Sequence, residues 1–234
     1  MIHILNATGG SDRVNSIQYE GEPTDKHKRE MNEDIPLITI DWDSIVPKPP
    51  SNTSDATKMD LEQVQRLTKD LSKDDYDMIM DVDDDPENLF RPYAKKMGID
   101  YPQELIDKAI QHIDVVILKL KYKFRRPRPS QLAPHLGYHI SVLVTKTHQT
   151  PSYPSGHQSQ GAMVAEVLSS LYPEHKTQWH KFSKLTGKAR VMQGVHYPSD
   201  NEVSVTLARV LWSNIKDNLY DKWTNRKNSL KFIL

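Results

Sequence analysis

Apolar side chains recur every three or four positions along most of the chain beyond residue 55, as in Leu61, Val64 and Leu67. This spacing places them on one face of an α-helix, which turns once in about 3.6 residues and buries such a face in a protein core. No segment shows the alternation of apolar and polar residues that is typical of a half-buried strand. We therefore expect an all-α fold, a compact helical bundle of about six helices. The first follows capping residues at 51–55, and the others cover about 86–97, 105–125, 156–171, 174–193 and 199–218.

The chain outside this pattern divides into an N-terminal arm and a short tail. Residues 1–34 mix small, polar and charged side chains without a helical period, whereas residues 35–46 are more apolar and are expected to dock in an extended form. The prolines of the run 47–50 then interrupt regular structure. The sequence thus predicts an irregular, extended or partly disordered arm over 1–55, a helical domain over 56–222 and a C-terminal tail over 223–234.

An acidic stretch over residues 74–85 follows the first expected helix, and we expect it to be a solvated loop. Asp81, Asp83 and Asp85 alternate as in a calcium-binding loop. Such a loop needs a glycine at its sharp turn and a glutamate at its end, and prolines stand at both positions here. The sequence therefore predicts no metal site in this stretch.

Composition and charge narrow the chemistry. Apolar residues make up 37% of the 234 residues, below the roughly 45–50% of ordinary globular domains, so part of the chain should lie outside the core. The 31 basic and 31 acidic side chains cancel, which argues against a general nucleic-acid binder. The absence of cysteine excludes thiol catalysis, disulfides and cysteine-bound zinc. No apolar run approaches the roughly 20 residues of a membrane span and no secretory signal is recognisable, so we expect a cytoplasmic protein without a transmembrane segment.

The segment Tyr153-Pro154-Ser155-Gly156-His157 directly precedes the amphipathic helix expected over 156–171. Ser155 and the glutamine three residues later have the spacing of a capping box, so the helix should begin here with unpaired backbone N–H groups that suit an anion. Gly156 lets a ligand approach the backbone, and His157 titrates near neutral pH. The segment is compatible with an anion site and with an ordinary helix cap that carries a surface histidine.

A second segment, residues 189–200, spans the junction of two expected helices. In an unbroken helix Arg190 and His196 would point roughly 120° apart, because six residues turn the helix by about 600°. Gly194 can end the first helix, which places Asp200 in the first turn of the next one and within reach of a His196 nitrogen. A carboxylate that holds one imidazole nitrogen leaves the other free as a nucleophile or ligand. The alternative is a helix–turn–helix corner with a capping aspartate.

The third segment is basic, with six lysines and arginines between Lys119 and Arg128 at the end of the helix expected over 105–125. Cations are favoured there because the helix macrodipole is negative at its C-terminal end. Pro127 and Pro129 flank Arg128, and they restrict the backbone and so aim its guanidinium group. The segment can form a phosphate site, or a solvated patch for anionic lipid or nucleic acid.

Together the three segments resemble the signature of one superfamily, which groups type 2 phosphatidic acid phosphatases, class A bacterial acid phosphatases and vanadium haloperoxidases. That signature consists of Lys and a later Arg-Pro, then Pro-Ser-Gly-His, then Ser-Arg followed by a spaced His and Asp. The second part matches at residues 154–157, and the third matches at Arg190, His196 and Asp200 with both spacings. Ala189 replaces the serine of the third part, which removes a hydroxyl group but no charged group.

The first part of the signature fits this sequence in two registers. Lys119 can pair with Arg126-Pro127, or Lys121 with Arg128-Pro129. We prefer the second register, because Lys-Tyr-x-Phe followed by a doubled Arg-Pro looks more like the soluble members of the superfamily.

The resemblance implies a phosphatase that forms a phosphohistidine and requires no metal. His196 would attack phosphorus, Asp200 would orient it, and His157 would protonate the leaving oxygen and later activate water. Fixed cations and backbone N–H groups suit the charge that a phosphoryl-transfer transition state spreads over its oxygens. The residues that would hold these oxygens are Lys121, Arg128, Ser155, Gly156 and Arg190. With His196 neutral and His157 protonated in the competent state, the rate should have a bell-shaped pH dependence.

Three functions stay open at this point. The preferred one is hydrolysis of a small-molecule phosphomonoester, without a cofactor and with vanadate as an inhibitor. The nearest rival is a vanadium-dependent haloperoxidase, in which vanadate is a prosthetic group bound at the His196 position. The third is a non-catalytic module that binds anionic lipid or nucleic acid through residues 119–128. The alcohol half of the substrate is left open, and a homo-oligomer is compatible with the sequence.

Overall fold

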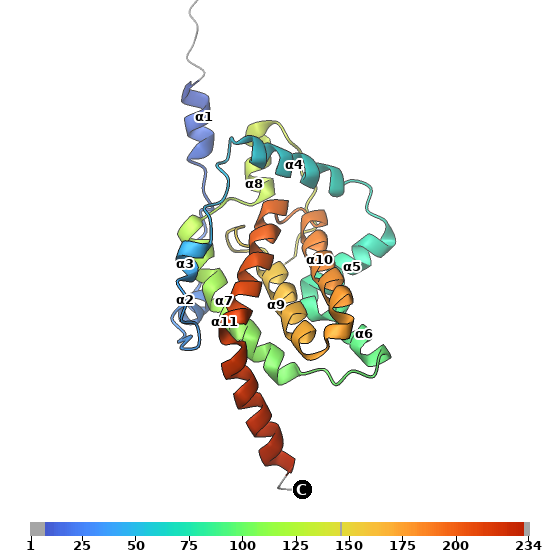
Figure 1. The fold of residues 1–234 in the computed structure, drawn as a ribbon. Helices are drawn as coiled ribbons and strands as arrows, with labels where there is room; N and C mark the ends of the chain where they lie inside the picture. The colour runs from blue at the N-terminus through green and yellow to red at the C-terminus, as the bar shows by residue number, and fades with distance from the viewer. Residues whose placement is uncertain (1–7, 146, 232–234) are drawn as a thin grey trace, which may run out of the picture.

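The computed structural model describes residues 8–145 and 147–231, and these residues form helices, turns and loops without a strand. Helix α9 lies at the centre of the bundle and packs against α7, α10 and α11 (Figure 1). The all-α expectation is therefore confirmed. The helices of the bundle are α4 (Asp55–Leu67), α5 (Lys73–Asp84), α6 (Arg91–Lys96), α7 (Gln103–Phe124), α8 (Pro129–Leu132), α9 (Gly156–Leu171), α10 (Lys176–Met192) and α11 (Pro198–Lys231), with short 3-10 helices at Pro86–Leu89, Ala133–Leu136 and Pro173–His175.

Helices α9 and α10 approach each other closely, because glycines lie where they cross. A Cβ atom on Gly161 would come within 2.8 Å of the Thr186 hydroxyl, and one on Gly187 within 2.0 Å of the Gln158 side chain. Most of α9 is buried, from Gln158 to Ser169, so the helix is covered on more sides than an amphipathic surface helix would be. This packing brings the beginning of α9 and the end of α10 to one side of the bundle.

The helix ends around the two basic segments follow from backbone conformation. Helix α7 ends where Arg125 adopts the left-handed conformation, with φ +49°, and donates its backbone N–H to the Lys121 carbonyl over 2.8 Å. Helix α10 ends just before Gly194, with φ +82°, as expected. Left-handed residues commonly terminate helices in this way. The chain therefore changes direction just before both Arg126 and His196.

The expectation of a solvated loop over residues 74–85 is wrong, because these residues form most of α5. Ser72 and Asp75 form a capping box at its start. Ile79 and Val82 are fully buried on one face of the helix, while most of its acidic side chains point outward. A single buried face is sufficient to hold a helix of this length against the bundle.

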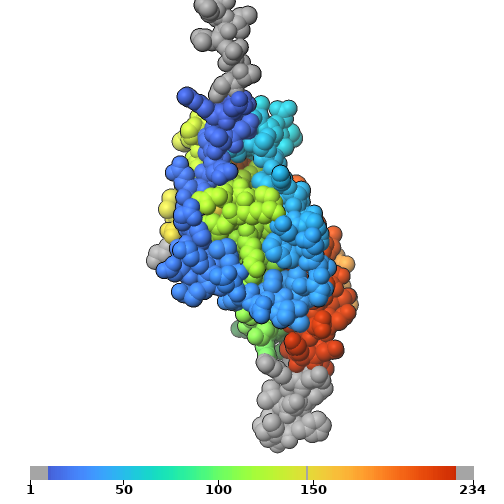
Figure 2. Space-filling view, turned by 90° about the vertical axis from the view of Figure 1, so that its left-hand side faces the viewer, coloured from blue at the N-terminus to red at the C-terminus, as the bar shows by residue number. Residues whose placement is uncertain are grey.

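The N-terminal arm differs from the extended form expected over residues 1–55, because it contains three short helices. These are α1 (Thr8–Asn15), α2 (Asp25–Met31) and α3 (Trp42–Ile45). The arm lies beside α7 and borders the end of that helix on both sides (Figure 2). Its anchors include the Tyr19 backbone N–H, which donates to the Arg125 carbonyl over 2.8 Å, and Asp43, which pairs with Lys123 at 2.6 Å.

The C-terminal tail expected over 223–234 also differs, because α11 continues as a helix to Lys231 and projects beyond the other helices (Figure 1). Residues 232–234 lie outside the described part. The division of the chain into a domain over 56–222 and two flanking segments stays a prediction. Within the described residues, no helix combines the length and the apolar character needed to cross a bilayer.

Candidate active site

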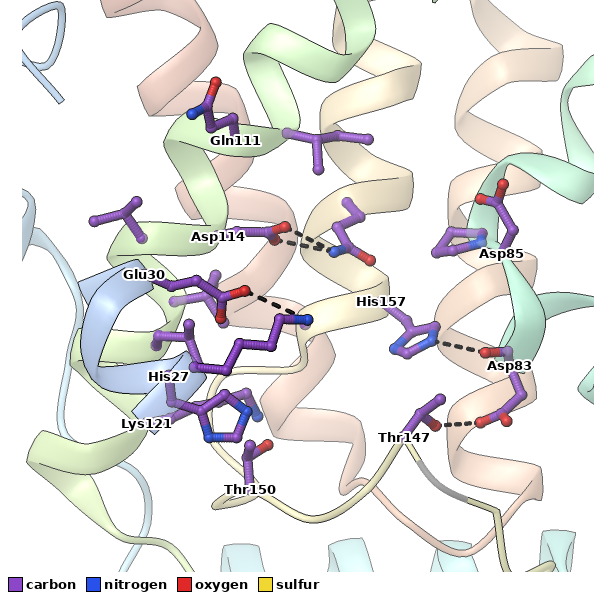
Figure 3. A pocket seen from close by; sticks show the side chains of 18 of the residues that line it. His27, Glu30, Asp83, Asp85, Gln111, Asp114, Lys121, Thr147, Thr150 and His157 are labelled. Carbon is purple, nitrogen blue, oxygen red and sulfur yellow. Dashed lines mark hydrogen bonds and ion pairs between the residues drawn. The ribbon is translucent and has the colours of Figure 1, made fainter. Parts of the chain in front are cut away.

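A cavity of about 740 Å³ opens at the side of the bundle where α7, α9 and the end of α5 meet the arm helix α2 (Figure 3). This volume is typical of a small-molecule site. The cavity brings together residues from all three sequence segments. From these segments, the cavity is lined by Lys121, Arg128, Gly156, His157 and His196.

His196 is held at both ring nitrogens. Its Nδ1 lies 3.0 Å from Asp200 Oδ2, and its Nε2 lies 2.9 Å from Arg128 Nη1. A guanidinium group only donates hydrogen bonds, so Nε2 must accept and the proton of the neutral ring lies on Nδ1, facing Asp200. Burial and Arg128 lower the pKa of His196 well below its ordinary value, which keeps the ring neutral. The lone pair of Nε2 thus faces the cavity, where Arg128 occupies it.

Asp200 is fully buried and saturated with donors. Besides His196, it accepts hydrogen bonds from the Ser152 hydroxyl at 2.6 Å, the Tyr197 backbone N–H at 3.0 Å and Arg126 Nη1 at 2.6 Å. Burial alone would raise the pKa of Asp200, but Arg126 and the hydrogen bonds from His196 and Ser152 hold it well below its usual range. A permanently ionised carboxylate fixes the tautomer and the orientation of His196.

Arg126 and Arg128 point to different places, although only one residue separates them. Arg126 lies over the Tyr197 ring, 3.8 Å from its centroid, and reaches Asp60 and Asp200 behind the cavity. Arg128 faces the cavity, where it also donates to the Val195 carbonyl at 2.7 Å. The geometry thus brings Lys121 and Arg128, the preferred register, to the cavity.

Lys121 is buried in the cavity wall, and its Nζ donates to the Pro151 carbonyl at 2.6 Å. Burial and the neighbouring Arg128 lower the pKa of Lys121 well below its ordinary value. Burial and the neighbouring Arg190 lower the pKa of Arg128 to about 10. Cations forced together in this way favour a bound anion, which would offset their mutual repulsion.

The beginning of α9 lacks the expected capping box. Ser155 caps no backbone N–H, and Gln158 instead donates to the Ser183 hydroxyl at 3.0 Å, inside the contact between α9 and α10. The Ser155 Oγ is buried and has no hydrogen-bond partner among the described residues. The Gly156 and His157 amides begin the helix, so their hydrogens have no intrahelical acceptor. These donors are left available for a ligand.

Arg190 lies behind the cavity wall and is held by Asp83, for which the sequence predicts no role at the site. Asp83 lies near the end of α5 and accepts hydrogen bonds from Arg190, Thr147 and Gln193. Burial would raise the pKa of Asp83, but these bonds together lower it to about 2. One signal was present in the sequence, since Asp83 lies four residues after Ile79 and therefore on the apolar face of α5.

His157 faces the same cavity as His196, on the side of Asp83 (Figure 3). Its Nε2 donates to the Asp83 backbone carbonyl at 3.3 Å. Burial and Arg190 lower the pKa of His157 to about 3. The protonated state expected from the resemblance therefore depends on a negative group entering the cavity.

The donor set fits an anion. Across residues 8–145 and 147–231, no three histidine, aspartate or glutamate side chains are grouped as metal ligands. Lys121 and Arg128 line the cavity and suit a tetrahedral oxyanion next to His196. Ser155 and Arg190 are not among the lining residues, but Ser155 Oγ and Arg190 Nε are among the buried donors that lack a partner within the described residues.

Comparisons with known proteins agree with this arrangement. Residues 108–220 match the family model described as the PAP2 superfamily. Over 111 residues the chain is 32% identical to a non-specific acid phosphatase of Providencia stuartii, and this alignment covers 46% of the chain and 41% of that protein. The chain thus spans less than half of the length of this curated relative.

Two crystal structures share the fold. A bacterial vanadium-dependent iodoperoxidase aligns with a TM-score of 0.58 at 16% identity, over 74% of this chain and 52% of that one. A transmembrane PAP2-type phosphatidylglycerolphosphate phosphatase from Bacillus subtilis aligns with a TM-score of 0.51 at 19% identity, over 73% and 88%. The chain is thus similar to the PAP2 superfamily over residues 108–220, and it shares its fold with a PAP2-type phosphatase and a vanadium-dependent iodoperoxidase.

Proposed function

We propose that the protein is a metal-independent phosphatase that hydrolyses small phosphomonoesters through a phosphohistidine at His196. The observation that carries the proposal is the state of the His196 ring. Its Nδ1 is bound by an ionised aspartate, and its unprotonated Nε2 lies 2.9 Å from Arg128 in a cavity lined by cations. A positioned and neutral imidazole is the form that attacks phosphorus.

The phosphoryl group would bind between the three cationic side chains and the start of α9. Lys121, Arg128 and Arg190 supply positive charge, and Ser155 Oγ with the Gly156 and His157 amides supply further donors. Charge in the transition state spreads over the equatorial oxygens, and donors that are already in position stabilise it without reorganising. This arrangement assigns no role to a metal ion.

The reaction then has two steps. In the first, His196 Nε2 forms a bond to phosphorus, the bond to the leaving oxygen breaks, and His157 gives that oxygen a proton. In the second, His157 takes a proton from water, the water oxygen bonds to phosphorus and the nitrogen–phosphorus bond breaks. Phosphate leaves, and His196 returns to its neutral form held by Asp200.

The substrate itself is expected to charge His157. In the protein alone, burial and Arg190 hold the pKa of His157 at about 3. A phosphoryl group with two negative charges beside the ring favours the protonated form, as an opposite charge within a few ångströms does. Substrate binding would therefore supply the general acid.

Hydrolysis of nitrophenyl phosphate tests the proposal. We expect release of nitrophenol that is unchanged by a strong chelator, because no step uses a metal ion, and competitive inhibition by vanadate, because vanadate occupies the phosphoryl site. Loss of activity with the chelator, restored by a divalent cation, would contradict the metal-independent mechanism. The absence of any hydrolysis would contradict the phosphatase assignment.

The same donors fit vanadate, because Lys121 and Arg128 line the cavity with His196 and suit any tetrahedral oxyanion. Lys121, Arg128, Arg190 and Ser155 would hold its oxygens, and His196 Nε2 would be its ligand. Bound vanadate supplies the activation of peroxide for halide oxidation. Halide oxidation that requires vanadate and peroxide, without phosphatase activity, would favour this second candidate.

A further inference from the structure

The cavity is larger than a phosphate group needs, and it continues outward between α7 and α9. On α7, Asp114 lies seven residues before Lys121, which is two helical turns or about 10.5 Å along the axis. On α9, Gln160 lies three residues after His157, which is about 4.5 Å along the axis. Both Asp114 and Gln160 line the cavity. The outer half of the cavity thus begins directly beyond the ring proposed to protonate the leaving oxygen.

Asp114 and Gln160 are joined by hydrogen bonds between their side chains in this outer half of the cavity. The Gln160 Nε2 donates to both carboxylate oxygens of Asp114, at 3.0 and 3.1 Å, and the two dashed lines at Asp114 in Figure 3 mark these bonds between α9 and α7. Within the described residues Asp114 forms no ion pair, and the nearby Glu30 is paired with Lys26 at 3.5 Å. A carboxylate can accept about four hydrogen bonds, so capacity remains on the cavity side.

The environment of Asp114 makes a further donor favourable. Burial raises the pKa of Asp114 to about 7, with the Gln160 amide opposing this shift. Lys26 and Glu30 act on Asp114 with opposite signs, and neither forms an ion pair with it in the described residues. A partly buried carboxyl group of this kind gains from a donor that replaces lost water. The leaving group of a bound ester is the part of the substrate that passes this position.

We propose that Asp114, oriented by Gln160, is a specificity-determining residue that recognises the leaving group by accepting a hydrogen bond from it. The preferred ester then carries a hydroxyl or ammonium donor on its leaving group. This inference rests on the proposed function, because it requires the phosphoryl group at His196 and the leaving oxygen at His157. Esters of simple alkyl alcohols lack the donor and gain nothing from Asp114.

Four substrates test the inference with the wild-type protein. Ethanolamine phosphate carries an ammonium donor, glycerol phosphate carries hydroxyl donors, choline phosphate carries a charge without an N–H, and nitrophenyl phosphate carries no donor. We expect kcat/KM for the better of the two donor esters to exceed that for choline phosphate by about tenfold or more, since a hydrogen bond to a charged group is worth this much. Equal values for the donor esters and choline phosphate would overturn the inference.

Substitution of Asp114 provides the second measurement. Asp114→Ala should lower kcat/KM for the donor esters by about ten- to hundredfold and leave nitrophenyl phosphate nearly unchanged. Asp114→Asn removes the charge but keeps an acceptor, so it should affect the ammonium ester more than the hydroxyl ester. The matched control is Asp77→Ala on α5, because this exposed aspartate is not among the residues that line the cavity. This control should leave unchanged the ratio of kcat/KM for the donor esters to kcat/KM for nitrophenyl phosphate.

The outcomes separate the two proposals. If Asp114→Ala lowers all four rates by the same factor, Asp114 has only a structural role and the inference is overturned, while the phosphatase assignment stands. If the wild-type protein hydrolyses none of the four esters, the proposed function itself fails.

Discussion

His196→Ala is expected to lower the turnover of nitrophenyl phosphate by at least about a thousandfold, or about 4 kcal/mol of barrier. The substitution removes the atom proposed to bond to phosphorus, and no other side chain in the cavity presents an unprotonated nitrogen held by a carboxylate. Nitrophenolate needs little help in leaving, so the loss reports the nucleophile rather than the general acid. The measurement is kcat at saturating substrate.

A matched control separates the nucleophile from a general effect on the fold. His148 is half-buried in the segment that leads to α9, and it is hydrogen-bonded to Thr145 at 3.4 Å. It is not among the residues that line the cavity. His148→Ala should retain nearly all of the activity. A His196→Ala protein that is folded and keeps more than about a tenth of the wild-type kcat would contradict the assignment of His196.

Arg126→Ala is expected to lower the free energy of unfolding by about 3–5 kcal/mol, because it leaves buried negative charge without its partner. Arg126 pairs with Asp200 at 2.6 Å and with Asp60 at 3.3 Å, and only 1% of its side chain is exposed. Asp200 would keep its other donors but lose its only guanidinium partner within the described residues. Urea unfolding at neutral pH measures the change.

The neighbouring residue provides the control for this prediction. Arg125 forms an ion pair at 2.9 Å with Glu22, whose side chain is 76% exposed. Arg125 also donates to the Tyr19 and Gly21 carbonyls, at 3.1 and 3.2 Å. The exposed pair contributes about 0–1 kcal/mol and no buried charge loses its partner, so Arg125→Ala should lower the free energy of unfolding by less than Arg126→Ala does. If Arg126→Ala and Arg125→Ala unfold at the same urea concentration, Arg126 does not hold Asp200 in the way the structure indicates.

Features determined by local spacing could be predicted from the sequence. Helix α9 runs from Gly156 to Leu171 as expected, and Gly194 ends α10 as expected. The three segments meet at one cavity because their residues lie at helix ends on one side of the bundle. Each of these helix boundaries could be predicted from a few residues that are adjacent in the sequence.

Other features depend on contacts between distant residues. The many acidic residues of α5 favour a solvated loop, so its buried face was not predicted from the sequence. The role of Asp83 was missed for the same reason, because its partner Arg190 lies on α10. The capping box at Ser155 does not form because Gln158 is drawn into the contact with α10. Arg126 reaches Asp60 and Asp200 whereas Arg128 reaches Val195 and His196, and these partners lie far from both arginines in the sequence. Tertiary packing decides each of these cases.

The central claim is a covalent bond between phosphorus and His196, and direct trapping of that intermediate tests it. His157→Ala removes the group proposed to activate water, so with radiolabelled nitrophenyl phosphate the first step should outrun the second and phosphoprotein should accumulate. We predict a label that is stable in alkali, labile in acid, mapped by peptide mass spectrometry to His196 and absent from the His196→Ala protein. Nitrophenol release without any covalent label, or a label on another residue, would contradict the account.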